Sequence, residues 1–98
     1  MAFVQIIDLK TNQFDEVQRL AKEWETTAGA ASKARRHVLC RDRDAGDRYL
    51  NIVFFDSFEE AMQNSEDPTT QEFASKMAAL AKGEPAFLNL DVIEDVTY

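Results

Sequence analysis

Residues 48–56 of the 98-residue chain, RYLNIVFFD, are the stretch that decides the fold. Apolar side chains occupy both alternating sets of positions, which predicts a strand that is buried on both faces. The exception is Asn51, a side-chain amide in the middle of the stretch. An amide that is buried without a partner costs roughly 1–3 kcal/mol. The sequence therefore predicts that Asn51 points towards a cavity that holds water, a ligand or other polar side chains.

The elements around this strand alternate between the two periodicities of strand and helix. Apolar residues recur at helical spacing after Asn12, with Asp15 three residues later, and this helix should end before Gly29. A second helix opens with a capping box at 57–60 and restarts at Asp67 and Pro68. Strands are expected at residues 2–9, 35–41, 48–56 and 86–96, with a turn at 44–47 and a helix stop at 83–85.

The resulting order, βαββαβ, predicts an α+β protein with one domain over residues 1–98. This order is typical of a ferredoxin-like antiparallel sheet with the helices on one face.

Composition restricts the partners. With 11 Lys and Arg against 18 Asp and Glu, the net charge of −7 argues against nucleic acid and anionic membranes. No apolar run is long enough for a signal peptide or a membrane span. The single cysteine, Cys40, cannot form an internal disulfide, so we expect a reducing cytoplasm. One His and one Cys on opposite strand phases do not predict a metal site.

The strand phases divide the sheet into an apolar set and a mixed set, and we expect the apolar set to lie under the helices. The apolar set is Val4, Ile6, Val38, Cys40, Leu50, Ile52, Phe54, Leu88, Leu90 and Val92. The mixed set is Phe3, Gln5, Ile7, Arg35, His37, Leu39, Tyr49, Asn51, Val53, Phe55, Phe87, Asn89, Asp91 and Ile93. The mixed face is too apolar to be left in water, which predicts a homodimer through this sheet face. Its polar members would then point into the space between two sheets.

The βαββαβ order, the segment YLNIVFFDSFEEAMQNSEDP (49–68) and the strand PAFLNLDVIED (85–95) resemble the dimeric α+β barrel superfamily. Within it the chain is most similar to the antibiotic biosynthesis monooxygenase-like domains. The resemblance implies a homodimer with a ligand cavity in each subunit, between sheet and helices or inside the barrel. It also implies one of several activities: cofactor-independent oxidation of polycyclic phenols to quinones, haem degradation, isomerisation, or aldehyde or lactone chemistry.

Two branches of this superfamily can be compared residue by residue. The quinone-forming monooxygenases carry an Asn and a Trp four residues apart on the third strand, where this chain has Asn51 and Phe55. The amide is kept, and the ring N–H donor is lost. The haem-degrading branch has a helix His and a strand-one Asn, where this chain has no helix His and offers Gln5. We therefore expect neither haem nor another cofactor.

Two functions stay open. The first is a cofactor-independent monooxygenase acting on an oxygenated aromatic compound, in which Asn51 holds the oxyanion and His37 or Asp91 accepts the proton. Its small apolar substrate would contact Gln5, Tyr49, Phe55, Phe87 and Asn89. The alternative is a non-catalytic dimeric module for binding or assembly, which the missing strand Trp favours.

Each of these residues also has a structural interpretation. His37 would be solvated, Asn51 would bridge two sheets, and Asp91 would form a salt bridge between chains with Arg35. Tyr49 and Phe87 would pack inside the barrel. The basic cluster of the hairpin is either a solvated surface or an anion-attracting entrance: Lys33, Arg35, Arg36, Arg41, Arg43 and Arg48.

Overall fold

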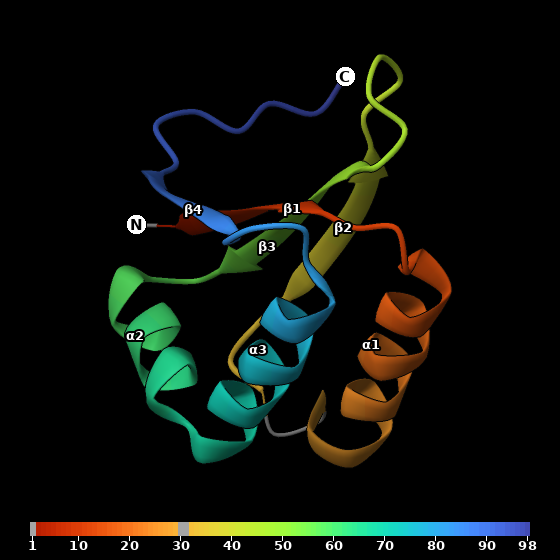
Figure 1. Ribbon diagram of the computed structural model, residues 1–98. Helices are drawn as coiled ribbons and strands as arrows, with labels where there is room; N and C mark the ends of the chain where they lie inside the picture. The colour runs from red at the N-terminus through yellow and green to blue at the C-terminus, as the bar shows by residue number, and fades with distance from the viewer. Residues whose placement is uncertain (1, 30–31) are drawn as a thin grey trace.

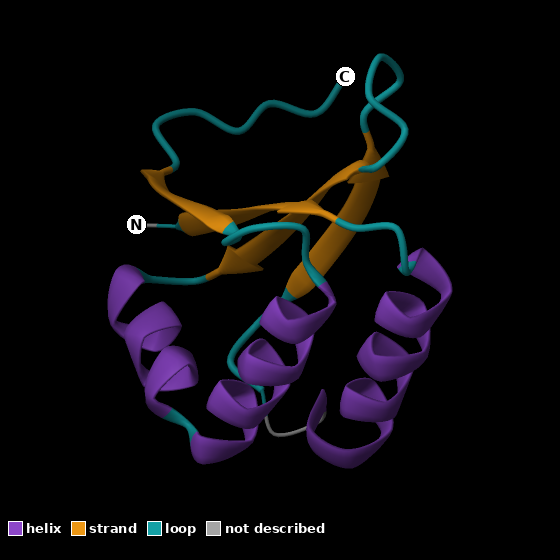
Figure 2. Cartoon of the chain, in the orientation of Figure 1, coloured by secondary structure: helices purple, strands orange, loops and turns teal. Residues whose placement is uncertain are grey.

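The protein is a two-layer α+β structure, seen here in a computed structural model that describes residues 2–29 and 32–98 (Figures 1 and 2). Its elements are β1 (Phe3–Lys10), α1 (Phe14–Ala28), β2 (Arg36–Arg41), β3 (Arg48–Phe55), α2 (Phe58–Glu66), α3 (Pro68–Leu80) and β4 (Ala86–Asp91). This order confirms the predicted βαββαβ arrangement, with the second helix in two pieces. One sheet forms the upper layer of Figure 2, and all three helices lie on one of its faces.

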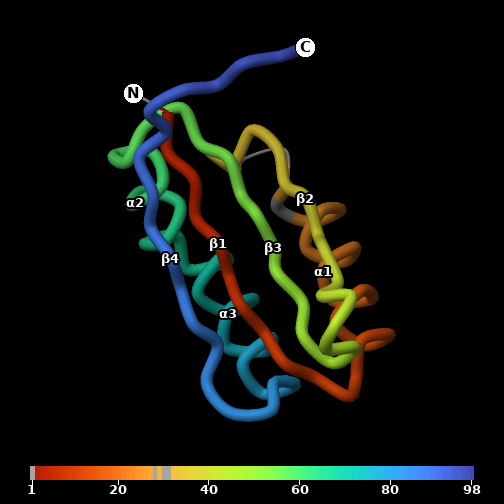
Figure 3. The backbone as a smooth tube through the Cα atoms, turned by 90° about the horizontal axis from the view of Figure 1, so that it is seen from above, coloured from red at the N-terminus to blue at the C-terminus, as the bar shows by residue number. Residues whose placement is uncertain are grey.

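The sheet is antiparallel, with strand order β2-β3-β1-β4 (Figure 3). The two long strands β1 and β3 form its centre, and the register pairs Phe3 with Phe55 and Ile7 with Asn51. The shorter strands β2 and β4 form the edges. The stretch that decided the fold from sequence is therefore a central strand, as its apolar faces predicted.

The helices cover the mixed face of the sheet, so the expected assignment of the two faces is wrong. The ring of Phe3 lies 5.3 Å from that of Phe58 on α2, and Tyr49 stacks on Phe14 of α1 at 4.2 Å between centroids. Because side chains alternate along a strand, the whole mixed set lies on the helix side. The set that contains Ile52 faces away from the helices, where Leu88 is 51% exposed.

The physical reason for this reversal lies in the distribution of the aromatic residues. On the mixed face the large rings stand at the ends of the strands, and the polar residues stand between them. Phe3, Phe55 and Ala61 of α2 form the buried cluster at one end, with Val53 packed against it. Helices can cover this face because its polar residues lie between the aromatic ends. Strand composition alone does not show which of the two faces the helices cover.

The ends of two elements differ from the prediction. The first helix begins at Phe14 rather than near Asn12, with Gln13 as an N-cap residue that makes no side-chain capping hydrogen bond. The buried Thr11 holds the chain just before it. Its hydroxyl accepts a hydrogen bond from the Gln13 N–H at 2.9 Å and donates one to the Leu80 carbonyl at 2.7 Å. The last strand ends at Asp91 rather than Val96, because its partner β1 begins opposite Asp91.

The predicted caps of the other helices are confirmed. Ser57 accepts from the Glu60 N–H at 3.1 Å and begins α2, while Asp67 accepts from the Thr69 N–H at 2.8 Å and begins α3. Pro68 occupies the first turn of α3.

Much of the basic cluster holds the hairpin in place. Arg48 binds Asp8 of β1 at 2.8 Å and Asp42 of the hairpin at 2.9 Å. The Arg48 hydrogen bond lowers the pKa of Asp8. The pKa of Asp42 is lowered by the backbone N–H of Asp44 and then by Arg48. Arg41 lies over the rings of Phe14 and Tyr49.

The structure therefore supports the interpretation of the basic cluster as a hairpin surface with internal partners. Arg35 is likewise paired within the chain, with Asp56 at 2.8 Å, and not with Asp91.

Candidate functional site

The polar residues of the mixed face form one patch between the sheet and the helices. Gln5 stands opposite both Val53 of β3 and Asn89 of β4, and its Nε2 donates to the Asn89 Oδ1 at 3.1 Å. Asn51 is two residues before Val53, so it lies diagonally next to Gln5, and it is diagonal to His37 of β2 as well. Diagonal neighbours in a sheet are about 7–8 Å apart. The sheet therefore brings together four of the predicted site residues: His37, Asn51, Gln5 and Asn89.

Asn51 is the unusual member of this patch. Its Oδ1 is buried and has no hydrogen-bond partner among residues 2–29 and 32–98. An acceptor that loses water without gaining a donor is destabilising by roughly 1–3 kcal/mol. That the Asn51 amide points towards a cavity stays a prediction. The amide faces the layer between sheet and helices, and not one between two sheets.

His37 lies at the border of this layer. Its Nε2 is 3.5 Å from Oε1 of Glu25 on α1, and its side chain is 44% exposed. It lines a hollow of about 300 Å³ between the end of α1 and the start of β2, together with Trp24, Glu25 and Arg36. An imidazole in this position can reach both water and the hollow, as a proton acceptor must.

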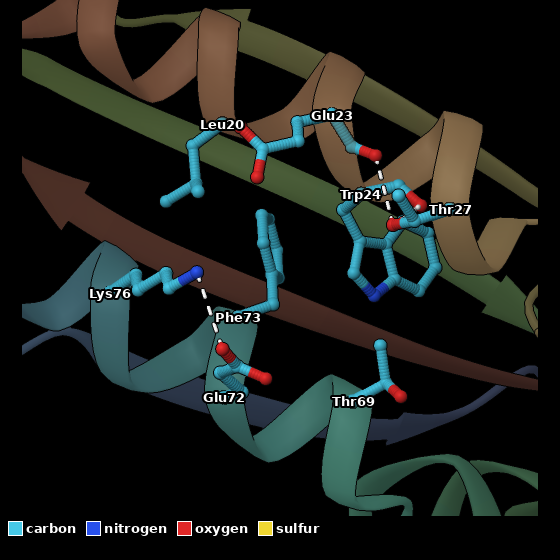
Figure 4. A pocket seen from close by; sticks show the side chains of 8 residues that line it. All are labelled: Leu20, Glu23, Trp24, Thr27, Thr69, Glu72, Phe73 and Lys76. Atoms are coloured by element: carbon cyan, nitrogen blue, oxygen red, sulfur yellow. Dashed lines mark hydrogen bonds and ion pairs between the residues drawn. The ribbon is translucent and has the colours of Figure 1, made fainter.

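A second hollow of about 260 Å³ lies between α1 and α3 (Figure 4). Its apolar wall is made by Leu20 and Trp24 of α1 and by Phe73 of α3. Trp24 lines both hollows. Trp24 stands on the apolar side of α1, where helical spacing alone indicates a core residue and not the wall of a hollow.

Helix α3 runs beneath β1 and β4 (Figure 3). None of the residues of α3, all of them in the described part of the chain, is fully buried. Phe73 and Met77, on its apolar stripe, are only half-buried. Phe87 of β4, on the helix side of the sheet, is 53% exposed. This part of the helix layer is therefore loosely packed against the sheet.

The remaining predicted residues lie outside the patch. Tyr49 and Phe55 face the helices but are buried in the aromatic packing at the two ends of the strands. Neither can contact a ligand in this arrangement. Asp91 lies at the exposed end of the edge strand β4, opposite Phe3. It is too far along the sheet to belong to the group around Asn51.

The site is therefore rich in neutral hydrogen-bonding groups and apolar surface. Across the described ranges, no cluster of three or more His, Cys, Asp and Glu side chains is arranged to hold a metal ion. Within the same residues, no helix has the length and apolar character that crossing a membrane requires.

Known structures resemble this chain over nearly its full length. A cofactor-independent oxygenase from Streptomyces nogalater, SnoaB, solved as an asparagine-to-alanine variant, matches with a TM-score of 0.83 and 13% identity. The match covers 99% of this chain and 98% of that one. A candidate antibiotic biosynthesis monooxygenase from Caulobacter crescentus matches with a TM-score of 0.81 and 14% identity, over 95% of this chain and 91% of that one.

Rv0793 from Mycobacterium tuberculosis matches with a TM-score of 0.80 and 13% identity, over 99% of this chain and all of that one. The chain thus has the ferredoxin-like fold that these solved structures share, as its sequence pattern predicted. No protein-family profile matches the sequence. No curated protein matches it either.

Proposed function

We propose that the chain binds a small, flat, oxygenated aromatic molecule between its sheet and its helices and oxidises it without a cofactor. The observation that carries this proposal is the buried Asn51 Oδ1, which has no partner in the described residues and lies on the helix side of the sheet. The two hollows of the same layer are lined by Trp24 together with other residues of α1, α3 and the start of β2. The fold that the chain shares with a cofactor-independent oxygenase supports the proposal.

Asn51 has the chemistry for both states of a phenolic substrate. Its Oδ1 can accept a hydrogen bond from a phenol, and its Nδ2 can donate one to the phenolate. His37 is the proton acceptor that the geometry favours over Asp91, because His37 is diagonal to Asn51 on the neighbouring strand. The deprotonated substrate is electron-rich and reacts with dioxygen. One oxygen atom enters the ring as a carbonyl, and the other leaves as water with two substrate hydrogens.

A second candidate function is a binding module without catalysis, and one observation favours it. Phe55 occupies the position of the strand Trp in the quinone-forming monooxygenases, and its ring is buried against Phe3 and Ala61. It supplies neither an N–H donor nor a wall of the cavity.

Oxygen uptake separates the two functions. Anthrone, a tricyclic phenol tautomer, is mixed with the protein in an oxygen electrode, and anthraquinone is followed by its absorbance. We expect uptake above the uncatalysed rate, with Asn51→Ala lowering it by about a hundredfold, the loss typical of an oxyanion donor. A wild-type protein that binds anthrone at the background oxidation rate would identify the non-catalytic module instead.

We further propose that a second copy of the chain covers the open sheet face, opposite to the helices. This face carries two apolar rows across the sheet, one through Phe54, Val4 and Leu90 and the other through Val38, Ile52, Ile6 and Leu88. A row of this kind is costly to hydrate, at roughly 25 cal/mol per Å². The homodimer therefore stays a proposal, but the sheet face at its interface is the one that carries the apolar set and not the one that carries the mixed set. A reducing cytoplasm also stays a proposal, made from the single thiol of Cys40.

A further inference from the structure

We propose that Trp24 is a ligand-binding residue, and that the groove between α1 and α3 takes a flat, neutral aromatic ketone whose oxygen accepts a hydrogen bond from the Trp24 indole. This inference rests on the proposed function, since it names the ligand class and the residue that recognises it. It adds a donor from helix α1 to a site that sequence reasoning placed on the strands alone.

The first step is the state of the indole N–H. The Trp24 Nε1 is buried and has no hydrogen-bond partner in the described part of the chain. Trp24 and Phe73 face each other across the groove, with ring centroids 5.6 Å apart (Figure 4). The indole nitrogen points from α1 towards α3. A buried indole N–H normally has a partner, so a ligand that moves aside the atoms covering Nε1 gains an unpaired donor.

The second step is that most polar groups around the groove are already engaged. The Thr27 hydroxyl donates to the Glu23 carbonyl at 3.0 Å, and Lys76 pairs with Glu72 at 3.3 Å. A bridging water needs two to four polar partners, and the wall formed by Leu20, Trp24 and Phe73 offers one N–H. A ligand with an apolar body and a single acceptor satisfies the N–H and covers the wall at once.

The third step concerns the charge of the ligand. The carboxylates at the rim of the groove are paired, Glu72 with Lys76 and Glu23 with Arg19, each at 3.3 Å. The charge that acts on a ligand is therefore that of the molecule as a whole. The whole chain carries −7. Charges of one sign around a cleft disfavour ligands of that sign. The groove should therefore accept a neutral molecule and reject its carboxylate analogue, more so at low salt.

The fourth step concerns size. A volume of about 260 Å³ lies below the usual range for drug-sized ligands, which begins at roughly 300 Å³. Two fused rings with one short substituent are the natural occupant. Trp24 and Phe73 pack on each other with their ring planes tilted by 35°, so together they give such rings one apolar surface to lie on.

Three matched probes isolate the recognised group: 2-acetonaphthone, 2-ethylnaphthalene and 2-naphthoate. Trp24 is the only tryptophan, so its indole N–H gives a single cross-peak in a nitrogen–proton correlation spectrum. We expect this peak to move downfield with the ketone, because a carbonyl accepts its hydrogen bond. The hydrocarbon, 2-ethylnaphthalene, should bind but shift the indole cross-peak little. The carboxylate, 2-naphthoate, should have the lowest affinity of the three probes.

Calorimetry with Trp24→Phe completes the test, since the substitution keeps an aromatic ring and removes the N–H. We expect ketone affinity to fall by about three- to tenfold, the range of one neutral hydrogen bond, with hydrocarbon affinity unchanged. Thr69→Val, which removes a hydroxyl from the same groove, should preserve the ketone preference. Equal affinity of the wild type for ketone and hydrocarbon would overturn the proposal, as would a preference that persists in Trp24→Phe.

The same variants separate this inference from the proposed function. A ketone-dependent indole shift in a protein that leaves anthrone unoxidised supports the Trp24 site and contradicts the oxygenase. Anthrone oxidation that depends on Asn51, with an indole peak indifferent to the ketone, supports the oxygenase and contradicts the Trp24 site.

Discussion

Tyr49 and Asn51 stand two residues apart on the same face of β3, and their surroundings differ completely. Tyr49 is buried, and its ring stacks on Phe14 at 4.2 Å with an interplanar angle of 9°. Asn51 has a buried acceptor without a partner in the described residues. Tyr49 therefore contributes to stability, whereas Asn51 subtracts from it, a cost that the proposed ligand would offset.

Alanine substitutions at these two positions should separate the roles. We expect Asn51→Ala to leave the melting temperature within about two degrees of wild type or to raise it, because the lost acceptor had no donor. Tyr49→Ala should cost about 3–5 kcal/mol, the usual range for a buried ring. Thermal unfolding followed by circular dichroism measures both. A loss of stability in Asn51→Ala comparable to that in Tyr49→Ala would show that the amide has a structural partner.

Arg48 makes stability depend on acid pH. Its hydrogen bonds hold the pKa of Asp8 below the ordinary value, and that of Asp42 is lowered by the Asp44 N–H and then by Arg48. A carboxyl whose pKa is lower in the folded state stabilises the fold above its unfolded pKa, and this contribution is lost as pH falls. Melting temperature should therefore drop as pH falls below about 4. Arg48→Leu should flatten that drop, whereas a profile unchanged by Arg48→Leu would contradict the assignment.

At the scale of elements, α3 is held at its N-terminus by one side chain. Asp67 accepts from the Thr69 N–H at 2.8 Å, and Asp67 also ends α2. Asp67→Ala should destabilise the fold by about 1 kcal/mol, the typical value of an N-cap. Asp67→Asn keeps an acceptor oxygen and should therefore retain most of the stability that Asp67→Ala loses. Urea denaturation measures the free energy of unfolding of both variants. Equal losses of stability in Asp67→Ala and Asp67→Asn would mean that the charge of Asp67, and not its capping hydrogen bond, stabilises the fold.

The type and order of the helices and strands could be predicted from the sequence wherever a local pattern determines them. The Ser57 and Asp67 caps, the hairpin and the antiparallel sheet all follow from short-range rules, and the structure contains them. The end of β4 at Asp91 was not predictable, because it depends on where its partner β1 begins. The start of α1 depends on Thr11, whose hydroxyl reaches Leu80 across the molecule.

The face of the sheet that the helices cover was predicted wrongly for a related reason. The stretch 48–56 shows that both faces of β3 are apolar, and it does not say what covers each. Phe3, Tyr49 and Phe55 meet helix side chains because the loops place α1 and α2 on that side. The site residues Asn51, Gln5 and Asn89 were correctly predicted to share a face, since strand alternation alone determines that. Trp24 was missed because helical periodicity cannot show a gap between two helices.

At the scale of the whole molecule, the open sheet face leads to a test of assembly. Ile52 lies in the middle of an apolar row on this face, between Val38 and Ile6. Ile52→Asp should therefore convert a dimer into monomers, because a buried carboxylate has no partner there. Light scattering should report about twice the 11.2 kDa chain mass for the wild type and 11.2 kDa for the variant.

Two controls define this test. Glu59→Lys changes the surface of α2 and should leave the dimer intact. Val53→Asp, on the helix side of the sheet, should instead unfold the chain, because Val53 packs against the cluster of Phe3, Phe55 and Ala61. A monomeric wild type at micromolar concentration would remove the dimer proposal.

The half-buried state of α3 has a consequence for the rates at which parts of the molecule open. An element with few buried side chains is released at lower free energy than a central strand, so its amide hydrogens exchange with solvent through local opening. The amides of Pro68–Leu80 should exchange earlier than those of β1 and β3, and a bound ketone should slow them selectively. Local opening of the loosely packed helix α3 would then be the step by which the ligand enters and leaves.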